Sequence, residues 1–245
     1  MINVVIPMAG TGERFKCKTN TPKPLIEVDF EPMFIKAVES LGLQNISTKY
    51  TFITSTELAD RVDREIRNSG IRFYEIIALE KKTEGPACTA LLAVDAINND
   101  VPLIIANCDQ ILLVGSEFEK HCFASKNPFV VTFTGGEASK HSFVEVDRGQ
   151  CNYFTEKDKI SDTALTGIHF WDQGKKFVSS AIKMMIAQDK APNGEYYVSK
   201  SYNYLNGPIT VMHVPPRGFY AIGTPEELEH YAKEQEAKIN YNPPC

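Results

Sequence analysis

The chain has 245 residues, of which 43% are hydrophobic and 23% are charged, and a net charge of −5 at pH 7. This composition is typical of a soluble globular protein, and the length suits one α/β domain, which we expect to span residues 1–245. The acidic balance argues against a nucleic-acid partner. No apolar run approaches the ~20 residues of a membrane span, and no basic region precedes the first strand-like segment. We therefore expect neither membrane association nor a secretory signal.

The cysteines are scattered along the chain and form no Cys-x-x-Cys pair. This spacing predicts neither a disulfide framework nor a zinc site, so we expect a reduced, cytoplasmic protein. Nothing in the sequence fixes the oligomeric state, and assembly into a homo-oligomer is left open.

Strand-like and helix-like segments alternate through the first half of the chain. The strand patterns there cover residues 3–8, 50–54, 72–78 and 102–106, and the helical patterns cover residues 32–41, 57–68, 86–96 and 116–125. The second half has strand patterns at residues 129–134, 143–146, 152–155, 165–171, 209–214 and 218–222, and helical patterns at residues 174–188, 197–205 and 224–240. Such alternation predicts an α/β fold, a single Rossmann-like domain whose mostly parallel mixed sheet is flanked by helices, plus a small lobe from the second half.

The final predicted helix has a clear start signal. Thr224 is suited to cap it, Pro225 suits its first position, and Glu227 completes a capping box.

The first 25 residues carry the most specific pattern in the chain. An apolar strand opens into a Gly-rich loop, and Arg14 and the Lys23 of a Pro-Lys-Pro segment follow. A loop of this kind presents backbone N–H groups to phosphates, and the two cations supply the charge that a triphosphate needs. We expect Arg14 and Lys23 to be catalytic. The loop residues expected to bind nucleotide are Met8, Ala9, Gly10, Thr11 and Gly12.

Three other meanings of a Gly-rich loop do not fit this sequence. A P-loop requires Gly-Lys followed by Ser or Thr. A dinucleotide loop requires a third Gly where Phe15 stands, and a protein-kinase loop requires an Asp-Phe-Gly partner. A tight turn with two ordinary surface cations remains the plain structural alternative.

The loop together with Arg14 and Pro-Lys-Pro resembles the N-terminal motif of the sugar-phosphate nucleotidylyltransferases, within the NTP transferase superfamily. The resemblance covers about residues 3–230. It implies a fold of the glycosyltransferase-A type, in which the lobe binds the acceptor. It also implies transfer of a nucleoside monophosphate to a phosphorylated small molecule with release of pyrophosphate, and contacts of Gly10, Gly12, Arg14 and Lys23 with the nucleotide.

Asp109 follows the apolar strand at residues 102–106. Ligands of open α/β sheets bind at the carboxyl ends of strands, where a carboxylate can hold Mg²⁺ against phosphates. The position resembles the family's metal-binding Asp, so we expect Asp109 to be a catalytic residue and a Mg²⁺ ligand; an Asp that merely caps a turn is the alternative. The family's second metal Asp is replaced by Ala221. Either Asp109 suffices with phosphates and water, or another residue such as Glu195 substitutes.

Residues 79–87 resemble the family's base-reading segment, where a Gln precedes a Gly by five residues. Gly85 matches that Gly, Glu80 stands at the Gln position, and Thr83 lies between them. A carboxylate only accepts hydrogen bonds, and cytosine offers an N4 donor where uracil and thymine offer an acceptor. Glu80 therefore favours CTP. The alternative for Glu80 is a solvated loop charge with no role in base recognition. The alternative for the enzyme is a UTP- or dTTP-dependent sugar-1-phosphate nucleotidylyltransferase.

The acceptor side is assigned through the resemblance alone. Glu156 and Lys157 match a Glu-Lys-Pro element, although Asp158 replaces its Pro; Lys157 is thereby implied to contact the acceptor phosphate. Gly167 matches a Thr-Gly-Ile step, and Glu195 matches a Gly-Glu acceptor segment.

The run Thr-Glu-Gly-Pro-Ala at residues 83–87 resembles capsule-biosynthesis members of the family. The resemblance implies phosphoglutamine or a sugar phosphate as the acceptor and a role in capsular or surface polysaccharide synthesis. Two other classes remain. A glycosyltransferase of related fold would usually show Asp-x-Asp, of which Asn107-Cys108-Asp109 supplies half, and Ala221 is compatible with a nucleotide-binding protein without catalysis.

Overall fold

The computed structural model describes residues 1–241, so residues 242–245 of the expected domain lie outside the described part. The strands are β1 (Ile2–Pro7), β2 (Glu27–Val28), β3 (Glu31–Pro32), β4 (Thr48–Ser55), β5 (Tyr74–Leu79), β6 (Leu103–Ala106), β7 (Gln110–Leu112), β8 (Phe129–Thr134), β9 (Ser142–Asp147), β10 (Gln150–Glu156), β11 (Thr163–Trp171), β12 (Thr210–His213) and β13 (Phe219–Ala221). The α-helices are α1 (Met33–Ser40), α2 (Ala59–Ser69), α3 (Pro86–Leu91), α4 (Val94–Ile97), α5 (Glu117–Ala124), α6 (Gly174–Ile186), α7 (Val198–Ser201) and α8 (Pro225–Tyr241).

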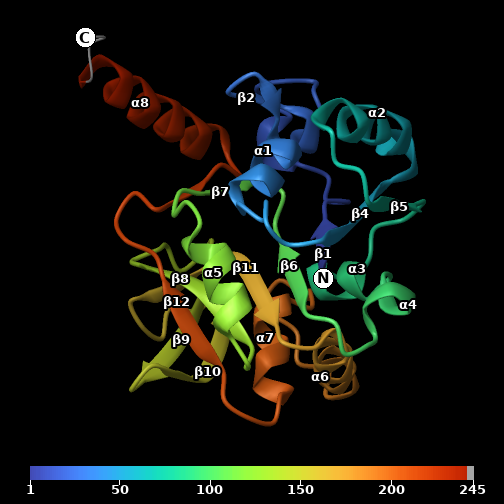
Figure 1. Ribbon diagram of the computed structural model, residues 1–245, viewed down its shortest axis with the longest axis vertical. Helices are drawn as coiled ribbons and strands as arrows, with labels where there is room; N and C mark the ends of the chain where they lie inside the picture. Colours follow the sequence, from blue (N-terminus) through green and yellow to red (C-terminus); the bar gives the residue numbers. More distant parts are fainter. Residues whose placement is uncertain (242–245) are drawn as a thin grey trace.

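Nine of the strands in the described residues form one mixed sheet, in the order β5-β4-β1-β6-β11-β8-β12-β10-β9 (Figure 1). The strands β5, β4, β1 and β6 pair in parallel. The strand β11 lies antiparallel between β6 and β8 and joins the two halves of the chain. The predicted α/β class with a mixed sheet flanked by helices is confirmed. The expected lobe corresponds to the β8–β12 half, which continues the same sheet.

Both faces of the sheet are covered by helices. Val4 and Ile6 of β1 pack in a core with α1, α2 and α5, whereas Val5 packs in a second core with α3, α4 and α6. Burial on both faces explains why the central parallel strands are continuous apolar runs. Since helices cover both faces of the sheet, the loops that follow β1 and β6 at the carboxyl ends of these strands are the part of the sheet edge that meets solvent.

A third, smaller cluster supports the loops at this edge. Phe15, Ile111, Tyr220 and Tyr231 pack together, which joins the loop after β1 to β7, β13 and α8. The helix α8 projects from the body (Figure 1). It is capped by Thr224 as predicted, because the backbone N–H of Glu227 donates to the Thr224 hydroxyl at 3.2 Å.

Three local features differ from the prediction. The helix expected at residues 86–96 divides into α3 and α4, because Leu92 and Ala93 make tight hydrogen bonds to residues three positions earlier. The helix expected at residues 197–205 is α7 followed by a 3₁₀ turn at Tyr202–Tyr204. The short strands β2, β3 and β7 were missed because two or three residues are too few to establish a period.

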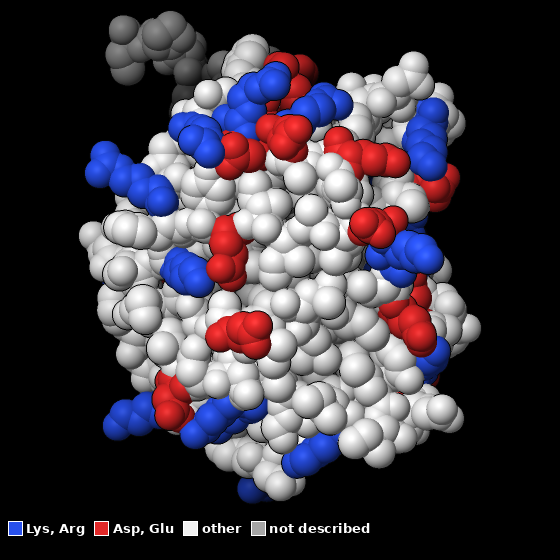
Figure 2. Space-filling view, turned by 90° about the vertical axis from the view of Figure 1, so that its right-hand side faces the viewer, with Lys and Arg blue, Asp and Glu red and all other residues white. Residues whose placement is uncertain are grey.

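No helix in the described part of the chain is long and apolar enough to span a membrane. On the face in Figure 2, basic and acidic side chains are interspersed, without a block of one sign.

Candidate active site

Three adjoining hollows form one cleft across the carboxyl ends of β1 and β6. The Thr83 hollow, of about 200 Å³, and the Asp109 hollow, also about 200 Å³, share Pro7 and Gly10. The Gln110 hollow, of about 170 Å³, shares Pro86 with the first and Asp109 with the second. A molecule in the cleft can therefore reach from Thr83 past Asp109 to Gln110.

The predicted nucleotide loop lines this cleft. Met8 and Gly12 line the Asp109 hollow, and Ala9 lines the Thr83 hollow. Thr11 lines a further hollow of about 460 Å³ between the loop and the Pro-Lys-Pro segment. Gly12 has a φ of +61°, and a Cβ there would lie 2.7 Å from the Cβ of Lys23. Only glycine permits this close packing of the two loops.

An ion pair joins the loop after β1 to the end of β6. The Lys23 ammonium donates to Oδ2 of Asp109, and the two side chains are 20% and 23% exposed. Burial lowers the pKa of Lys23, but the Asp109 carboxylate outweighs this effect, and the net shift of the pKa is upward. Lys23 is therefore charged at neutral pH.

Arg14 lies in the 3₁₀ turn Glu13–Phe15 and is exposed. It lines the Gln110 hollow together with Asp109, and its charge acts on Lys23 by lowering that residue's pKa. The structure thus brings together Arg14, Lys23 and Asp109, the three residues expected to be catalytic.

One further carboxylate approaches Asp109. A Cβ on Gly223 would lie 2.5 Å from Oδ2 of Asp109 and 3.5 Å from Oε2 of Glu227, so both carboxylates lie beside this glycine. Oε2 of Glu227 accepts the Gly223 N–H at 3.0 Å. Ala221 supplies no ligand oxygen from its side chain. Glu195, the substitute named from sequence, lies in the Thr83 hollow instead. No group of three metal-binding side chains occurs within the described residues.

The Thr83 hollow is bordered by two hydroxyls and a backbone carbonyl. The hydroxyls of Thr83 and Thr89 lie 3.0 and 3.2 Å from the Gly85 carbonyl oxygen and 2.6 Å from each other. This arrangement fixes the segment that the sequence assigned to base recognition, and it places Thr83 and Gly85 in the cleft as expected.

Glu80 is placed differently from the sequence-based expectation. It is exposed directly after β5 and is absent from the linings of the hollows described above. The reason is that β5 ends at Leu79 and the chain turns before it enters the cleft at Lys82. The carboxylate that lines the Thr83 hollow is Glu195.

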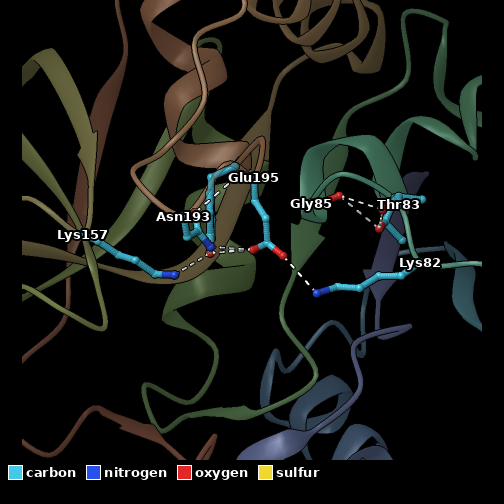
Figure 3. A network of polar contacts seen from close by, with 8 residues as sticks. Lys82, Thr83, Gly85, Lys157, Asn193 and Glu195 are labelled. Carbon is cyan, nitrogen blue, oxygen red and sulfur yellow. Dashed lines mark hydrogen bonds and ion pairs between the residues drawn. The ribbon is translucent and has the colours of Figure 1, made fainter.

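A polar network links Glu195 to Lys82 on one side and, through Tyr197, to Lys157 on the other (Figure 3). Its carboxylate accepts from Lys82 at 3.0 Å, from Asn193 at 2.8 Å and from Tyr197 at 3.0 Å. Burial raises the pKa of Glu195, but the hydrogen bonds from Lys82 and Tyr197 outweigh it, and the net shift is downward. Lys157 donates to the Tyr197 hydroxyl at 2.8 Å. Lys157 is therefore held at this network and does not line the Gln110 hollow.

The Gln110 hollow contains the other two residues assigned to the acceptor. Glu156 is 4% exposed, and its carboxylate accepts from the hydroxyls of Ser142 and Ser199, the latter at 3.0 Å. Burial raises the pKa of Glu156. Gly167 has a φ of +87°, and a Cβ there would overlap the Asn107 amide.

Among the side chains of this hollow that the sequence analysis did not assign to the site are Gln110, Lys140, His141 and His169. Lys140 lies 2.9 Å from Oε1 of Glu137 and 3.7 Å from Oε1 of Glu227, so it adds a cation to the lining of this hollow. The sequence feature that could have pointed to Lys140 and His141 is their position shortly after a Gly-Gly pair, which is typical of a loop. The inward direction of His169 depends on strand register and had no local signal.

Comparison with protein families gives a match between residues 3–201 and the nucleotidyl transferase model. No curated protein sequence matches the chain.

Solved structures share the fold. A nucleoside-diphosphate-sugar pyrophosphorylase from Vibrio cholerae RC9 is 23% identical with a TM-score of 0.80, over 94% of this chain and 99% of that one. The inositol-1-phosphate CTP transferase from T. maritima is 14% identical with a TM-score of 0.74, over 100% and 98% of the two chains. The CTP:phosphocholine cytidylyltransferase from Streptococcus pneumoniae is 18% identical with a TM-score of 0.73, over 96% and 98%. These likenesses show the fold, and the family match over residues 3–201 shows that the chain belongs to the nucleotidyl transferase family.

Proposed function

We propose that the protein is a Mg²⁺-dependent cytidylyltransferase that transfers CMP from CTP to a phosphorylated small molecule and releases pyrophosphate. The observation that carries the proposal is the meeting of the Gly-rich loop, Lys23 and Asp109 between two further hollows. One hollow suits the base and the other suits the acceptor, so the α-phosphate would lie between them.

In the proposed reaction, a phosphate oxygen of the acceptor attacks the α-phosphorus of CTP. The new P–O bond forms as the bond to the bridging oxygen of the β-phosphate breaks, and pyrophosphate leaves with that electron pair. Such transfers depend on positioning and charge neutralisation. Lys23 and Arg14 are the cations that neutralise the triphosphate, and backbone N–H groups of the Gly-rich loop hold it.

The donor set fits Mg²⁺. Magnesium takes one or two carboxylates and completes its octahedron with phosphate oxygens and water. Asp109 would provide the carboxylate, and Glu227, whose carboxylate lies beside the same glycine, Gly223, would replace the missing Asp at position 221. When bound, Mg²⁺ neutralises the charge of the triphosphate.

Cytosine is the proposed base. A carboxylate accepts from its N4 amino group and repels the O4 oxygen of uracil or thymine. Glu80 remains the proposed reader, since it lies at the end of β5 and has no ion pair in the described residues that would hold it on the surface.

The acceptor is proposed to be phosphoglutamine or a sugar phosphate used in capsular or surface polysaccharide synthesis. Glu156 and Gly167 line its hollow, while Glu195, Lys157 and Tyr197 form the network beside it. The free cysteines in the described residues agree with the proposed cytoplasmic location.

A screen of CTP, UTP and dTTP against phosphorylated acceptors, with detection of pyrophosphate, tests the proposal. Pyrophosphate that requires CTP, Mg²⁺ and an acceptor is the expected result. Release of pyrophosphate with UTP or dTTP but not with CTP would contradict the assignment of the protein as a cytidylyltransferase. Use of a nucleotide-sugar without pyrophosphate would indicate a glycosyltransferase, and nucleotide binding without either product would indicate a non-catalytic protein.

A further inference from the structure

Two buried side chains of the Gln110 hollow carry polar atoms without a partner. Gln110 is 2% exposed, and neither its Oε1 nor its Nε2 makes a hydrogen bond within the described residues. His169 is 5% exposed, and its Nδ1 has no partner there. Unpaired buried polar atoms are rare in native proteins because each loses its hydration without compensation. Both side chains line the same hollow, and a rotation that turns their buried polar atoms toward it would let a bound molecule supply the missing partners.

Both side chains are held by rigid elements. Gln110 begins β7 and pairs with Ala221 of β13. His169 lies in β11, where it pairs with Ile105 on one side and Val130 on the other. Gly167 leaves room for the Gln110 amide, since a Cβ there would lie 3.0 Å from its Oε1. The backbone positions of both residues are thus fixed by the fold beside the hollow.

We call the buried residues Gln110 and His169 the floor of the hollow, and the more exposed Arg14 and Lys140 its rim. The floor and the rim differ in charge. Burial lowers the pKa of His169 to about 3, so at neutral pH the imidazole is uncharged and offers one donor and one acceptor. The Gln110 amide also offers both. Arg14 and Lys140 are the cations that line the hollow, and Asp109, Glu156 and Glu227 are its carboxylates. A phosphate suits these cations, and an uncharged polar group suits the floor.

We propose that Gln110 and His169 form a neutral hydrogen-bonding floor that selects acceptors with an uncharged hydroxyl or amide group at the end away from the phosphate. The inference rests on the proposed function in that it treats the Gln110 hollow as the acceptor site. A quaternary ammonium group is the contrasting case. It has no N–H or O–H to share, is recognised by aromatic faces, and would leave Gln110 and His169 unpaired.

Calorimetric titration tests this floor without requiring turnover. The protein is saturated with α,β-methylene-CTP and titrated with inositol 1-phosphate, glucose 1-phosphate or phosphocholine. We expect at least one hydroxylated phosphate to bind roughly 10-fold or more tightly than phosphocholine. Gln110→Met and His169→Phe should each weaken binding of that phosphate roughly 5- to 100-fold, and neither should change the affinity for phosphocholine or for the nucleotide analogue.

Matched controls separate the floor from general effects. Gln150→Met and His230→Phe make the same changes at exposed positions and should alter no affinity. His169→Gln keeps a neutral hydrogen-bonding group and should retain more affinity than His169→Phe. The inference is overturned if phosphocholine binds as tightly as the best hydroxylated phosphate, if no hydroxylated phosphate binds, or if both floor variants bind like the wild type. Selective binding without pyrophosphate release in any assay would contradict the proposed function and leave the floor standing.

Discussion

Lys23 and Asp109 are 86 positions apart in the chain and form an ion pair between the loops that follow β1 and β6. The two groups that the sequence assigned to different partners, a triphosphate and a metal ion, neutralise each other in the structure. We expect substrate binding to break this ion pair and to replace it with two interactions. Lys23 then pairs with phosphate oxygens, and Asp109 pairs with the metal ion. The pair keeps both side chains in the cleft at limited desolvation cost until then.

Replacement of Lys23 tests the cationic half of this exchange. Lys23→Ala removes a charge-assisted contact with the triphosphate, and we expect turnover to fall by about 10²- to 10³-fold at saturating nucleotide. Lys18→Ala, an exposed lysine of the same loop, is the control and should behave like the wild type. Turnover of Lys23→Ala close to that of the wild type would remove Lys23 from the mechanism.

The carboxylate half is tested by the metal. Asp109→Asn keeps the shape of the side chain and removes its charge, so we expect a folded protein whose activity is lost or requires far more Mg²⁺. Electron paramagnetic resonance of bound Mn²⁺ supplies a reading that does not depend on turnover. An unchanged metal titration in this variant would exclude Asp109 as a ligand.

Glu227 is expected to contribute to the same metal site. Glu227→Gln keeps an oxygen for the Gly223 N–H, so α8 should remain capped. Its Mn²⁺ affinity should fall by about 10- to 100-fold, the range expected for losing a supporting group of a metal site. Glu226→Gln, the exposed neighbour on the same helical turn, should leave the affinity unchanged. Equal Mn²⁺ affinities of Glu227→Gln and Glu226→Gln would exclude Glu227 as a contributor to the metal site.

Base selection is tested by comparing kcat/KM for CTP and UTP with one acceptor. The mismatch of a carboxylate with O4 is worth about 1–3 kcal/mol, which predicts roughly a 5- to 150-fold preference for CTP. Glu80→Gln should narrow this preference, because an amide also donates. Since Glu80 is exposed in the structure, an unchanged ratio in the variant would transfer the role to groups already in the Thr83 hollow, with Glu195 first among them.

The buried His169 predicts a pH effect on stability. Burial lowers its pKa from 6.5 to about 3, so below pH 6.5 the unfolded chain takes up a proton that the folded protein refuses. Stability present above pH 6.5 should therefore be lost as the pH falls toward 3, by on the order of 4 kcal/mol from this group alone. Urea unfolding between pH 4 and 7 should show a smaller decrease for His169→Phe. Parallel curves for the two proteins would contradict this assignment.

The sequence predicted those features of the site that depend on residues close together in the chain. The Gly-rich loop, Lys23 and Asp109 each follow an apolar strand, and the carboxyl ends of neighbouring parallel strands meet at one edge, so their meeting was predictable. Glu80 and Lys157 were matched by position in a motif, but a motif does not determine the direction of a side chain. The β5 turn places Glu80 outside the cleft, and Tyr197 holds Lys157 beside it.

The floor of the Gln110 hollow depends on features that a single sequence does not reveal. His169 shares one face of β11 with Leu165 and Gly167, which also line the hollow, but the strand pattern does not show which face borders a hollow. Gln110 faces it because a three-residue strand pairs with β13 from the far end of the chain. The long-range packing of one sheet face and the pairing of short strands leave no periodic signal in a single sequence.

The central claim is the transfer of CMP to an acceptor phosphate, and the most direct measurement follows both products at once. The protein is incubated with Mg²⁺, α-labelled CTP and a panel of phosphorylated acceptors, and pyrophosphate and labelled product are quantified together. The account predicts equal amounts of pyrophosphate and of labelled CMP–acceptor conjugate, both absent without acceptor and both strongly reduced in Lys23→Ala. Pyrophosphate without a labelled conjugate, or a conjugate formed equally well by Lys23→Ala, would contradict it.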